Sequence, residues 1–440
     1  MTGAGPGAVS SEQNGVTQTG TRWWALLFAS VAIFTSYYES DVIGEIAGLL
    51  EAQRHFSNTD IGNLNAAIYW PSVILALGGG LLIDRFGAAR IAFLASAIAV
   101  AGAALTAIGD PYSLMWMGRF IFGISEGVIF MALVAGLSLW FPPNGVALAI
   151  ALFLSLARVG SYACNTSSIW ARPLYDSGWQ PPLWLGTSLT AMGLLATTAF
   201  LFLDRYRPSI ADPGDAPERP RAPTRLLDQL RFDASYWYIL GVHVLYAAVF
   251  FPFRQTYAVK YLMHAKHLTL QQAGNVNSGV FLAAVFATPA FGLLADRIGH
   301  RALLLLVGTM LLPLTLVVLG ATDWNPWIST AVMGVSWAMV PAVIWPSTTL
   351  IVDPPRLGLA LGLITLIQAV GISLSNLAAG ALADAAGASA TRPEGYAVML
   401  WFFGAVSIAA LFAAWRLWRR ERGPTGHGLE LARVGVRHSG

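Results

Sequence analysis

Twelve long apolar runs follow one another along this chain, and no other feature limits its fold as strongly. A run of about 20 apolar residues has the length of an α-helix that crosses a bilayer. Hydrophobic residues make up 56% of the 440-residue sequence and charged residues only 11%, which leaves too little polar surface for a water-soluble protein. The sequence therefore predicts an all-α membrane protein with twelve transmembrane helices. The expected spans are 23–42, 61–83, 91–108, 114–139, 146–169, 183–203, 236–259, 273–295, 302–321, 327–352, 357–383 and 396–417.

The runs form two sets of six, which predicts two pseudo-symmetric six-helix bundles. Lys and Arg remain on the cytoplasmic side of membrane proteins, and their distribution here places both termini in the cytoplasm. The predominance of Arg over Lys indicates a bacterial origin, and hence the bacterial inner (plasma) membrane. The expected parts are a disordered N-terminal tail (1–21), an N-terminal bundle (22–203), a cytoplasmic linker (204–234), a C-terminal bundle (235–418) and a basic tail (419–440).

Two of the apolar runs carry a charge deep inside the predicted membrane. Glu126 lies in the fourth run and Arg158 in the fifth, and each is expected about 20 Å from a helix end, close to the bilayer midplane. Such a charge costs at least about 2.5 to 3.5 kcal/mol, so it faces a bundle interior or a wet cavity and has a partner. The partner is either the other charge, in a buried ion pair, or a substrate that carries both signs.

Further polar and aromatic residues in the spans are candidates for the wall of a cavity. The first span ends in an acidic and aromatic cluster at Tyr37–Asp41, which either reaches the membrane interface or lines a cavity. Aromatic rings tolerate varied substrate side chains, although single aromatic residues at helical spacing also serve as packing. The candidates beside Glu126 and Arg158 are Tyr37, Tyr38, Asp41, Tyr69, Trp70 and Trp345, with Asn277 and Gln368 as polar contacts from the second half.

No signature of covalent chemistry is found in the sequence. Cys164 is the single cysteine, the seven histidines show no metal-ligand spacing, and no catalytic triad or phosphate loop is present. We therefore expect no enzyme, no cofactor, no metal site and no nucleic-acid partner. The expected partners are a small-molecule substrate and the lipid bilayer, and the chain is expected to be a monomer, with a homodimer left open.

A loop with the pattern Gly-x-x-x-Asp-Arg-x-Gly follows both the second and the eighth span. Internal repetition of this kind is typical of transporters that alternate access by rocking one bundle against the other. The paired loops resemble the signature of the major facilitator superfamily. Small residues allow close helix packing, and a carboxylate near helix N-termini stabilises the cytoplasm-closed state, which predicts a gate. The gating residues are Gly80, Asp84, Arg85, Gly87 and Arg90 in the first loop, and Gly292, Asp296, Arg297, Gly299 and Arg301 in the second.

The fourth span also resembles the superfamily, from Arg119 to Gly127. In proton-linked members an arginine at this place is tied to coupling, which makes Arg119, together with Glu39, a candidate for coupling. The alternative is a structural arginine bonded to backbone carbonyls. The fifth span lacks the Gly-Pro pair of drug and proton antiporters, and the first lacks the Glu-x-x-Glu-Arg motif of proton-coupled peptide symporters.

Several blocks resemble more closely a subfamily of lysosomal dipeptide uniporters, among them Leu156–Ser161, Val249–Phe253 and Trp324–Trp327. The resemblance implies a dipeptide held at both ends, with an acid of the fourth helix at the amine and an arginine of the fifth, here Arg158, at the carboxylate. Glu126 falls one residue before the family's acid, about 100° around the helix. Either the helix locally rewinds or the amine site differs.

The sequence thus predicts a secondary transporter that moves small zwitterionic peptides by alternating access, as a uniporter. The alternative is a proton-coupled transporter of a small organic anion, in which Arg158 binds the carboxylate and Glu126 or Asp41 carries the proton.

Overall fold

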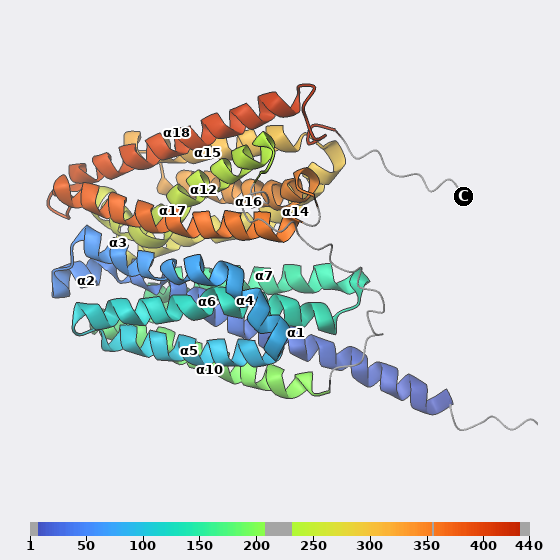
Figure 1. Ribbon diagram of the computed structural model, residues 1–440. Coiled ribbons are helices and arrows are strands. Elements are labelled where there is room, and N and C mark those ends of the chain that lie inside the picture. Colours follow the sequence, from blue (N-terminus) through green and yellow to red (C-terminus); the bar gives the residue numbers. More distant parts are fainter. Residues whose placement is uncertain (1–7, 207–230, 354–355, 432–440) are drawn as a thin grey trace, which may run out of the picture.

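The computed structural model describes residues 8–206, 231–353 and 356–431, and these residues form helices joined by short connections, with no strand among them. Figure 1 shows the helices in two layers, the first half of the chain in blue to green and the second half in yellow to red. Most of the expected linker (204–234) and the end of the expected basic tail (419–440) lie outside the described residues.

The first layer is the N-terminal bundle. Its long helices are α1 (Ala8–Glu45), α3 (Asn58–Ala67) with α4 (Trp70–Phe86), α5 (Ala88–Ile108), α6 (Tyr112–Trp140), α7 (Pro143–Asn165) and α10 (Gln180–Asp204); the short helices α2 (Ala47–Arg54), α8 (Ser167–Trp170) and α9 (Arg172–Asp176) connect them.

The second layer is the C-terminal bundle. It contains α12 (Ala234–Phe251), the π-helix η1 (Pro252–Tyr257), α13 (Ala258–Ala265), α14 (Leu270–Ile298), α15 (Arg301–Ala321), α16 (Pro326–Ile351), α17 (Leu357–Ala385), the 3₁₀ turn η3 (Pro393–Gly395) and α18 (Tyr396–Glu421).

Nine helical segments in the described ranges are long and apolar enough to cross a membrane on their own. Three further segments, α1, α3 with α4, and α14, occupy the remaining expected ranges. The helices therefore follow the expected spans in order, and the chain is an all-α membrane protein.

The N-terminal tail differs from the expectation of disorder over 1–21. Helix α1 begins at Ala8 and projects beyond the bundle before it enters the N-terminal layer (Figure 1). Adding residues to an existing helix costs little compared with nucleating a new one, so a membrane-anchored span can extend into a polar sequence. Residues 1–7 lie outside the described part of the chain.

Three of the expected spans are interrupted. The fifth span is interrupted at Thr166, between α7 and α8, and the other two interruptions place polar residues between the bundles. Helix α3 ends at Ala67 and α4 begins at Trp70, while α12 gives way to η1 at Pro252. Proline has no N–H to donate, which breaks the helical hydrogen-bond ladder, and single π-helical turns are frequent at functional sites. Arg254 and Gln255 lie in η1. The apolar runs gave no indication of these interruptions.

Within the N-terminal bundle, small residues let helices pack backbone to backbone. A Cβ at Gly102 of α5 would lie 2.5 Å from the Phe122 nitrogen of α6, and one at Gly118 of α6 would lie 2.4 Å from the Thr106 nitrogen of α5. Helices in lipid associate through such close contacts, because burial from water drives little of their association.

The two bundles meet mainly at one end, which we name the α2 end; the opposite end, where α1 begins and α18 finishes, is named the terminal end. At the α2 end, Asp384 of α17 accepts hydrogen bonds from Asn58 and Thr59 of α3 at 2.6–2.9 Å. Lys260 of α13 pairs with Glu51 of α2 at 2.7 Å. Polar contacts therefore close the α2 end across the bundle interface.

Candidate substrate-binding cavity

A cavity of about 520 Å³ lies between the two bundles. Its wall combines residues of α1, α4, α6 and α7 with residues of α12, η1, α14, α16 and α17, so both halves of the chain contribute. The volume falls within the range of roughly 300 to 1,000 Å³ that is usual for small-molecule sites.

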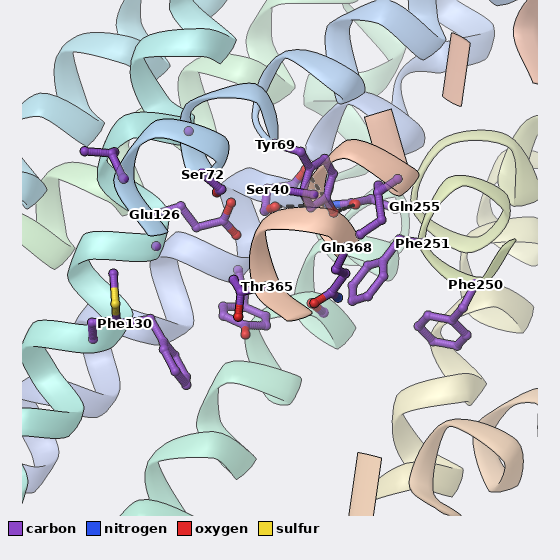
Figure 2. A pocket seen from close by; sticks show the side chains of 18 of the residues that line it. Ser40, Tyr69, Ser72, Glu126, Phe130, Phe250, Phe251, Gln255, Thr365 and Gln368 are labelled. Carbon is purple, nitrogen blue, oxygen red and sulfur yellow. Dashed lines mark hydrogen bonds between the residues drawn. The ribbon is translucent and has the colours of Figure 1, made fainter. Parts of the chain in front are cut away.

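Glu126 and Arg158 both line this cavity. Helix α6 runs without interruption past Glu126, so no local rewinding moves this residue to the next position. Figure 2 shows the Glu126 carboxylate directed into the cavity beside Ser40 and Ser72. The Arg158 guanidinium lies over the ring of Trp337 at 4.9 Å.

Glu126 and Arg158 do not form an ion pair with each other. Across the described residues, no nitrogen–oxygen contact of 4.0 Å or less joins them. The two opposite charges therefore lie in one cavity wall, and they do not form the buried ion pair that was the first of the two expected alternatives. Both charges lie where a molecule in the cavity can reach them.

A second pair of opposite charges in the cavity wall is closed. Arg254 of η1 donates to both carboxylate oxygens of Asp41 of α1, at 2.8 and 3.1 Å, and both side chains are 3% exposed. The guanidinium also lies over the ring of Phe281 at 4.7 Å. This bidentate pair joins the two bundles at the α2 side of the cavity. Asp41 was predicted as a cavity residue, whereas Arg254 was not.

Gln255 continues the contact between the bundles. Its amide nitrogen donates to the backbone oxygen and the hydroxyl of Ser40 at 3.1 and 3.0 Å, and its oxygen accepts from the Tyr69 hydroxyl at 2.5 Å. Tyr69 therefore lines the cavity as predicted but is already bonded across the interface. Figure 2 shows this group at one side of the cavity.

The second half contributes Gln368 and Trp345, both of which line the cavity. The Gln368 oxygen lies 3.0 Å from Nε2 of His243, and the His243 ring packs against Trp345 at 5.4 Å. Thr365 lies one turn before Gln368 on α17 and also lines the cavity, although the sequence gave no signal for it.

Three predicted cavity residues lie elsewhere. Tyr38 is buried in an apolar cluster, and Trp70 at the start of α4 is not among the lining residues. Asn277 donates to Asn165 at 2.5 Å and to the backbone oxygen of Arg254 at 3.1 Å. Neighbouring positions on a helix differ by 100°, so Tyr37 faces the cavity and Tyr38 does not.

Arg119 is fully buried and bonds mainly to backbone oxygens. It donates to the carbonyls of Glu39 and Ser40 at 2.9 and 2.8 Å, and to the Asn65 side chain at 3.0 Å. These bonds agree with the second alternative, a structural arginine bonded to backbone carbonyls. The Glu39 carboxylate is buried, and its Oε2 has no hydrogen-bond partner in the described structure.

The two gating loops lie at the terminal end, where α4 meets α5 and α14 meets α15. Gly80 has no heavy atom within 4 Å of its Cβ position, so the close helix packing expected there is absent in this conformation because the bundles are apart at this end. Asp84, Arg85, Gly87, Arg90, Arg297 and His300 are exposed, Gly299 and Arg301 are buried, and the surroundings of Gly292 and Asp296 lie outside the described part.

No cluster of three or more His, Cys, Asp or Glu side chains suited to a metal ion is found in the described residues. The cavity is lined by charged, amide, hydroxyl, aromatic and apolar side chains.

Two helical bundles that enclose a charged cavity and contact each other closely at one end define a multi-pass membrane transporter. Two stretches of the chain, residues 29–259 and 253–435, match the model of the Major Facilitator Superfamily. The chain belongs to this family, as its paired loops indicated.

Two relatives of this chain are named for different substrates. The Lysosomal dipeptide transporter MFSD1 of Danio rerio is 28% identical over 400 residues, which cover 88% of this chain and 84% of that protein. The Probable sulfoacetate transporter SauU of Cupriavidus necator is 22% identical over 292 residues, covering 64% and 66%.

The fold is similar to that of a bacterial homologue of the human lysosomal transporter Spinster, solved in an inward-facing and unoccupied conformation. The TM-score is 0.73 at 15% identity, over 91% of this chain and 96% of the other.

Proposed function

We propose that the protein moves small zwitterionic peptides, dipeptides first among them, across the membrane by alternating access and as a uniporter. One observation carries the proposal: Glu126 and Arg158 line the same cavity without pairing with each other. A dipeptide has a positive amine at one end and a negative carboxylate at the other, so it offers each of them a partner.

The chemistry of each residue fits one end of such a substrate. Arg158 has a planar fork of donors suited to two hydrogen bonds with a carboxylate. Glu126 supplies a carboxylate that accepts hydrogen bonds from an ammonium group. Because Asp41 and Arg254 bind each other, they neutralise their own charges and leave the other pair for the substrate.

The walls around these charges suit variable side chains. Tyr37, Phe130, Met131, Phe251 and Trp345 line the cavity and present rings or a flexible thioether. Aromatic and methionine side chains adapt to apolar groups of different shape. A substrate fixed by its two charged ends can therefore carry different side chains. The relative named as a dipeptide transporter supports this substrate class.

We further propose that the terminal end faces the cytoplasm, most simply at a bacterial inner membrane. Arg85, Arg90, Arg297 and the arginines in the last turns of α18 (Arg416, Arg419 and Arg420) lie at this end, and positive residues remain cytoplasmic. The cavity extends toward the terminal end along the start of α17, where Gly358 has no neighbour within 4 Å of its Cβ position. The conformation is then the inward-facing one.

Flux into liposomes tests the proposal. Purified protein is reconstituted, and uptake of a labelled dipeptide is measured with and without a proton gradient. We expect uptake that follows the dipeptide gradient and is unchanged by a collapsed proton gradient. Arg158→Lys keeps the charge but loses the fork, so its uptake should fall about tenfold, whereas the control Arg205→Lys, exposed beyond α10, should not differ from wild type. Uptake of no dipeptide by wild type would contradict the proposal.

The alternative is a proton-coupled transporter of a small organic anion, supported by the relative named as a sulfoacetate transporter. Arg158 would bind the anion, and Glu126 or Asp41 would carry the proton. Uptake of a mono- or dicarboxylate that requires a proton gradient, without dipeptide uptake, would favour this function.

A further inference from the structure

A buried acid outside the cavity has no partner for its charge. Glu45, the last residue of α1, is 2% exposed, and its Oε2 makes no hydrogen bond among the described residues. An ionised carboxylate at such a position is costly unless a positive group neutralises it. Glu45 lies one helical turn beyond Asp41, on the α2 side of the cavity.

Two further oxygens lie beside this carboxylate. A Cβ at Gly274 of α14 would have as its three nearest atoms the backbone oxygen of Asn165 at 2.3 Å, Oε2 of Glu45 at 3.0 Å and Oγ of Ser168 at 3.4 Å. The Ser168 side chain is fully buried and its hydroxyl also has no hydrogen-bond partner in the described structure. The three oxygens thus lie close together around Gly274, and glycine is the residue that lets them approach, because a Cβ there would clash with the Asn165 oxygen.

The backbone oxygen of Asn165 belongs to a helix end. Helix α7 stops at Asn165 and α8 starts at Ser167. In a continuous α-helix the nitrogen of Ile169 would donate to Asn165, but here it donates to Thr166 at 2.9 Å. The last carbonyls of a helix lack intrahelical partners and carry partial negative charge. Broken helices in transporters present such carbonyls to sodium ions or protons.

The nearby charged and titratable groups do not neutralise Glu45. Arg254 is already held by both oxygens of Asp41. The groups that interact electrostatically with Glu45 are Tyr38 and Asp41 of α1, Cys164 of α7, Tyr175 of α9 and Arg254 of η1. The carboxylate therefore requires a positive partner from outside this set.

We propose that Glu45, Ser168 and the backbone oxygen of Asn165 form a binding site for a small monovalent cation, a proton or a sodium ion. If a proton is bound, the protonated carboxyl of Glu45 would donate a hydrogen bond to the Ser168 hydroxyl or to the backbone oxygen of Asn165. A sodium ion would take all three as ligands, with water completing its shell. Either cation satisfies the polar atoms that the protein leaves without partners.

The site depends on contact between the bundles. Glu45, Asn165 and Ser168 belong to the N-terminal bundle, and Gly274, which covers them, belongs to the C-terminal bundle. When the α2 end opens, α14 withdraws from these oxygens and exposes them. The cation is thus enclosed in the present conformation and released to the α2 side in the opposite one, so it stabilises the present conformation without being carried across the membrane with the substrate.

The test uses no transport substrate, so it can fail independently of the proposed function. Thermal unfolding of the purified full-length protein is followed in sodium, potassium and choline chloride at equal ionic strength and at several pH values. Glu45→Gln mimics the neutral acid, Ser168→Ala removes a ligand, and Glu394→Gln, an exposed acid at the α2 end, is the control.

For a sodium site, we expect sodium to raise the unfolding temperature of wild type and Glu394→Gln by about 2 °C over choline. For a proton site, acidification should raise the unfolding temperature instead, whichever salt is present. The unfolding temperature of Glu45→Gln should not depend on sodium or pH in this way, and that of Ser168→Ala should depend on them more weakly than in wild type. If Glu45→Gln does not fold, Ser168→Ala alone decides. The proposal is overturned if wild type responds to neither cation, or if the variants respond as wild type does.

Discussion

Glycines at the two ends of the molecule have opposite surroundings. At the α2 end, a Cβ at Gly44 would lie 2.1 Å from the Gln255 oxygen, and one at Gly62 would lie 2.6 Å from the Asn376 oxygen, in each case in the other bundle. At the terminal end, Gly80 and Gly358 have nothing within 4 Å. The same residue type therefore marks backbone contact between the bundles at one end and open space at the other.

The difference shows which contacts a transport cycle has to exchange. The α2 end is closed by two charged contacts, the Asp41–Arg254 pair and the Lys260–Glu51 pair, and by backbone contact. Alternating access requires these contacts to break while the bundles close at the terminal end. Each contact at the α2 end thus contributes to the stability of this conformation relative to the opposite one.

The largest effect is expected from the buried ion pair. Asp41→Asn removes one partner and leaves Arg254 buried without a countercharge, which should cost about 3 to 5 kcal/mol of the stability of the closed α2 end. The measurement is labelling of a cysteine placed at Ser40, in a background with Cys164→Ser, by a reagent added from the α2 side. Labelling should rise steeply with Asp41→Asn.

The charge-swapped double variant, Asp41→Arg with Arg254→Asp, controls for the loss of charge. It should restore part of the protection from labelling. Equal labelling of wild type and Asp41→Asn would show that the pair does not hold the α2 end closed.

A matched pair of glycine substitutions sharpens the comparison of the ends. Gly44→Ala places a methyl group against the Gln255 backbone and should destabilise the conformation with the closed α2 end by about 1 to 3 kcal/mol. Gly80→Ala adds a methyl group in open space within a helix and should leave this conformation unchanged or slightly more stable. Thermal unfolding and the same cysteine labelling report both. If the two variants behave alike, the contrast between the ends is wrong.

A smaller effect is expected at the rim of the α2 end. Asp384→Asn exchanges a carboxylate for an amide opposite the donors of Asn58 and Thr59, with an expected loss of about 1 to 2 kcal/mol, since the site is partly exposed. Asp323→Asn, exposed at the same end, is the control. If the unfolding temperature falls equally for both variants, the loss of stability comes from the change in net charge and not from these hydrogen bonds.

The sequence predicted the membrane spans because apolar runs of bilayer length are a strong local signal. It also predicted that Glu126 and Arg158 face a bundle interior or a cavity, since a charge inside such a run is rare. Arg254 carries the same signal in the seventh span and could have been found in the same way. The face of a helix is harder to assign: Tyr37 and Tyr38 are equally aromatic, and only packing decides which one reaches the cavity.

The interruptions at Ile68, Thr166 and Pro252 could not be read from hydropathy, which averages over the residues that break a helix. Two of them matter for the proposals. The one at Pro252 places Arg254 opposite Asp41, and the one at Thr166 leaves the Asn165 carbonyl free of its helical donor. Local hydrogen bonding and contacts between the bundles set these geometries, and both lie outside what a linear pattern contains.

Glu126 and Arg158 are proposed to bind the two ends of one substrate, and substrate binding by this protein depends most on these two residues. The most direct test is the binding affinity of wild type, Glu126→Gln and Arg158→Lys for a dipeptide, its N-acetyl form and its C-terminal amide. We predict that Glu126→Gln weakens binding of the free dipeptide about tenfold or more and leaves binding of the N-acetyl form unaffected. Arg158→Lys should weaken binding of the ligands with a free carboxylate by a similar factor and leave binding of the C-terminal amide unaffected. Equal losses for all three ligands would contradict the account.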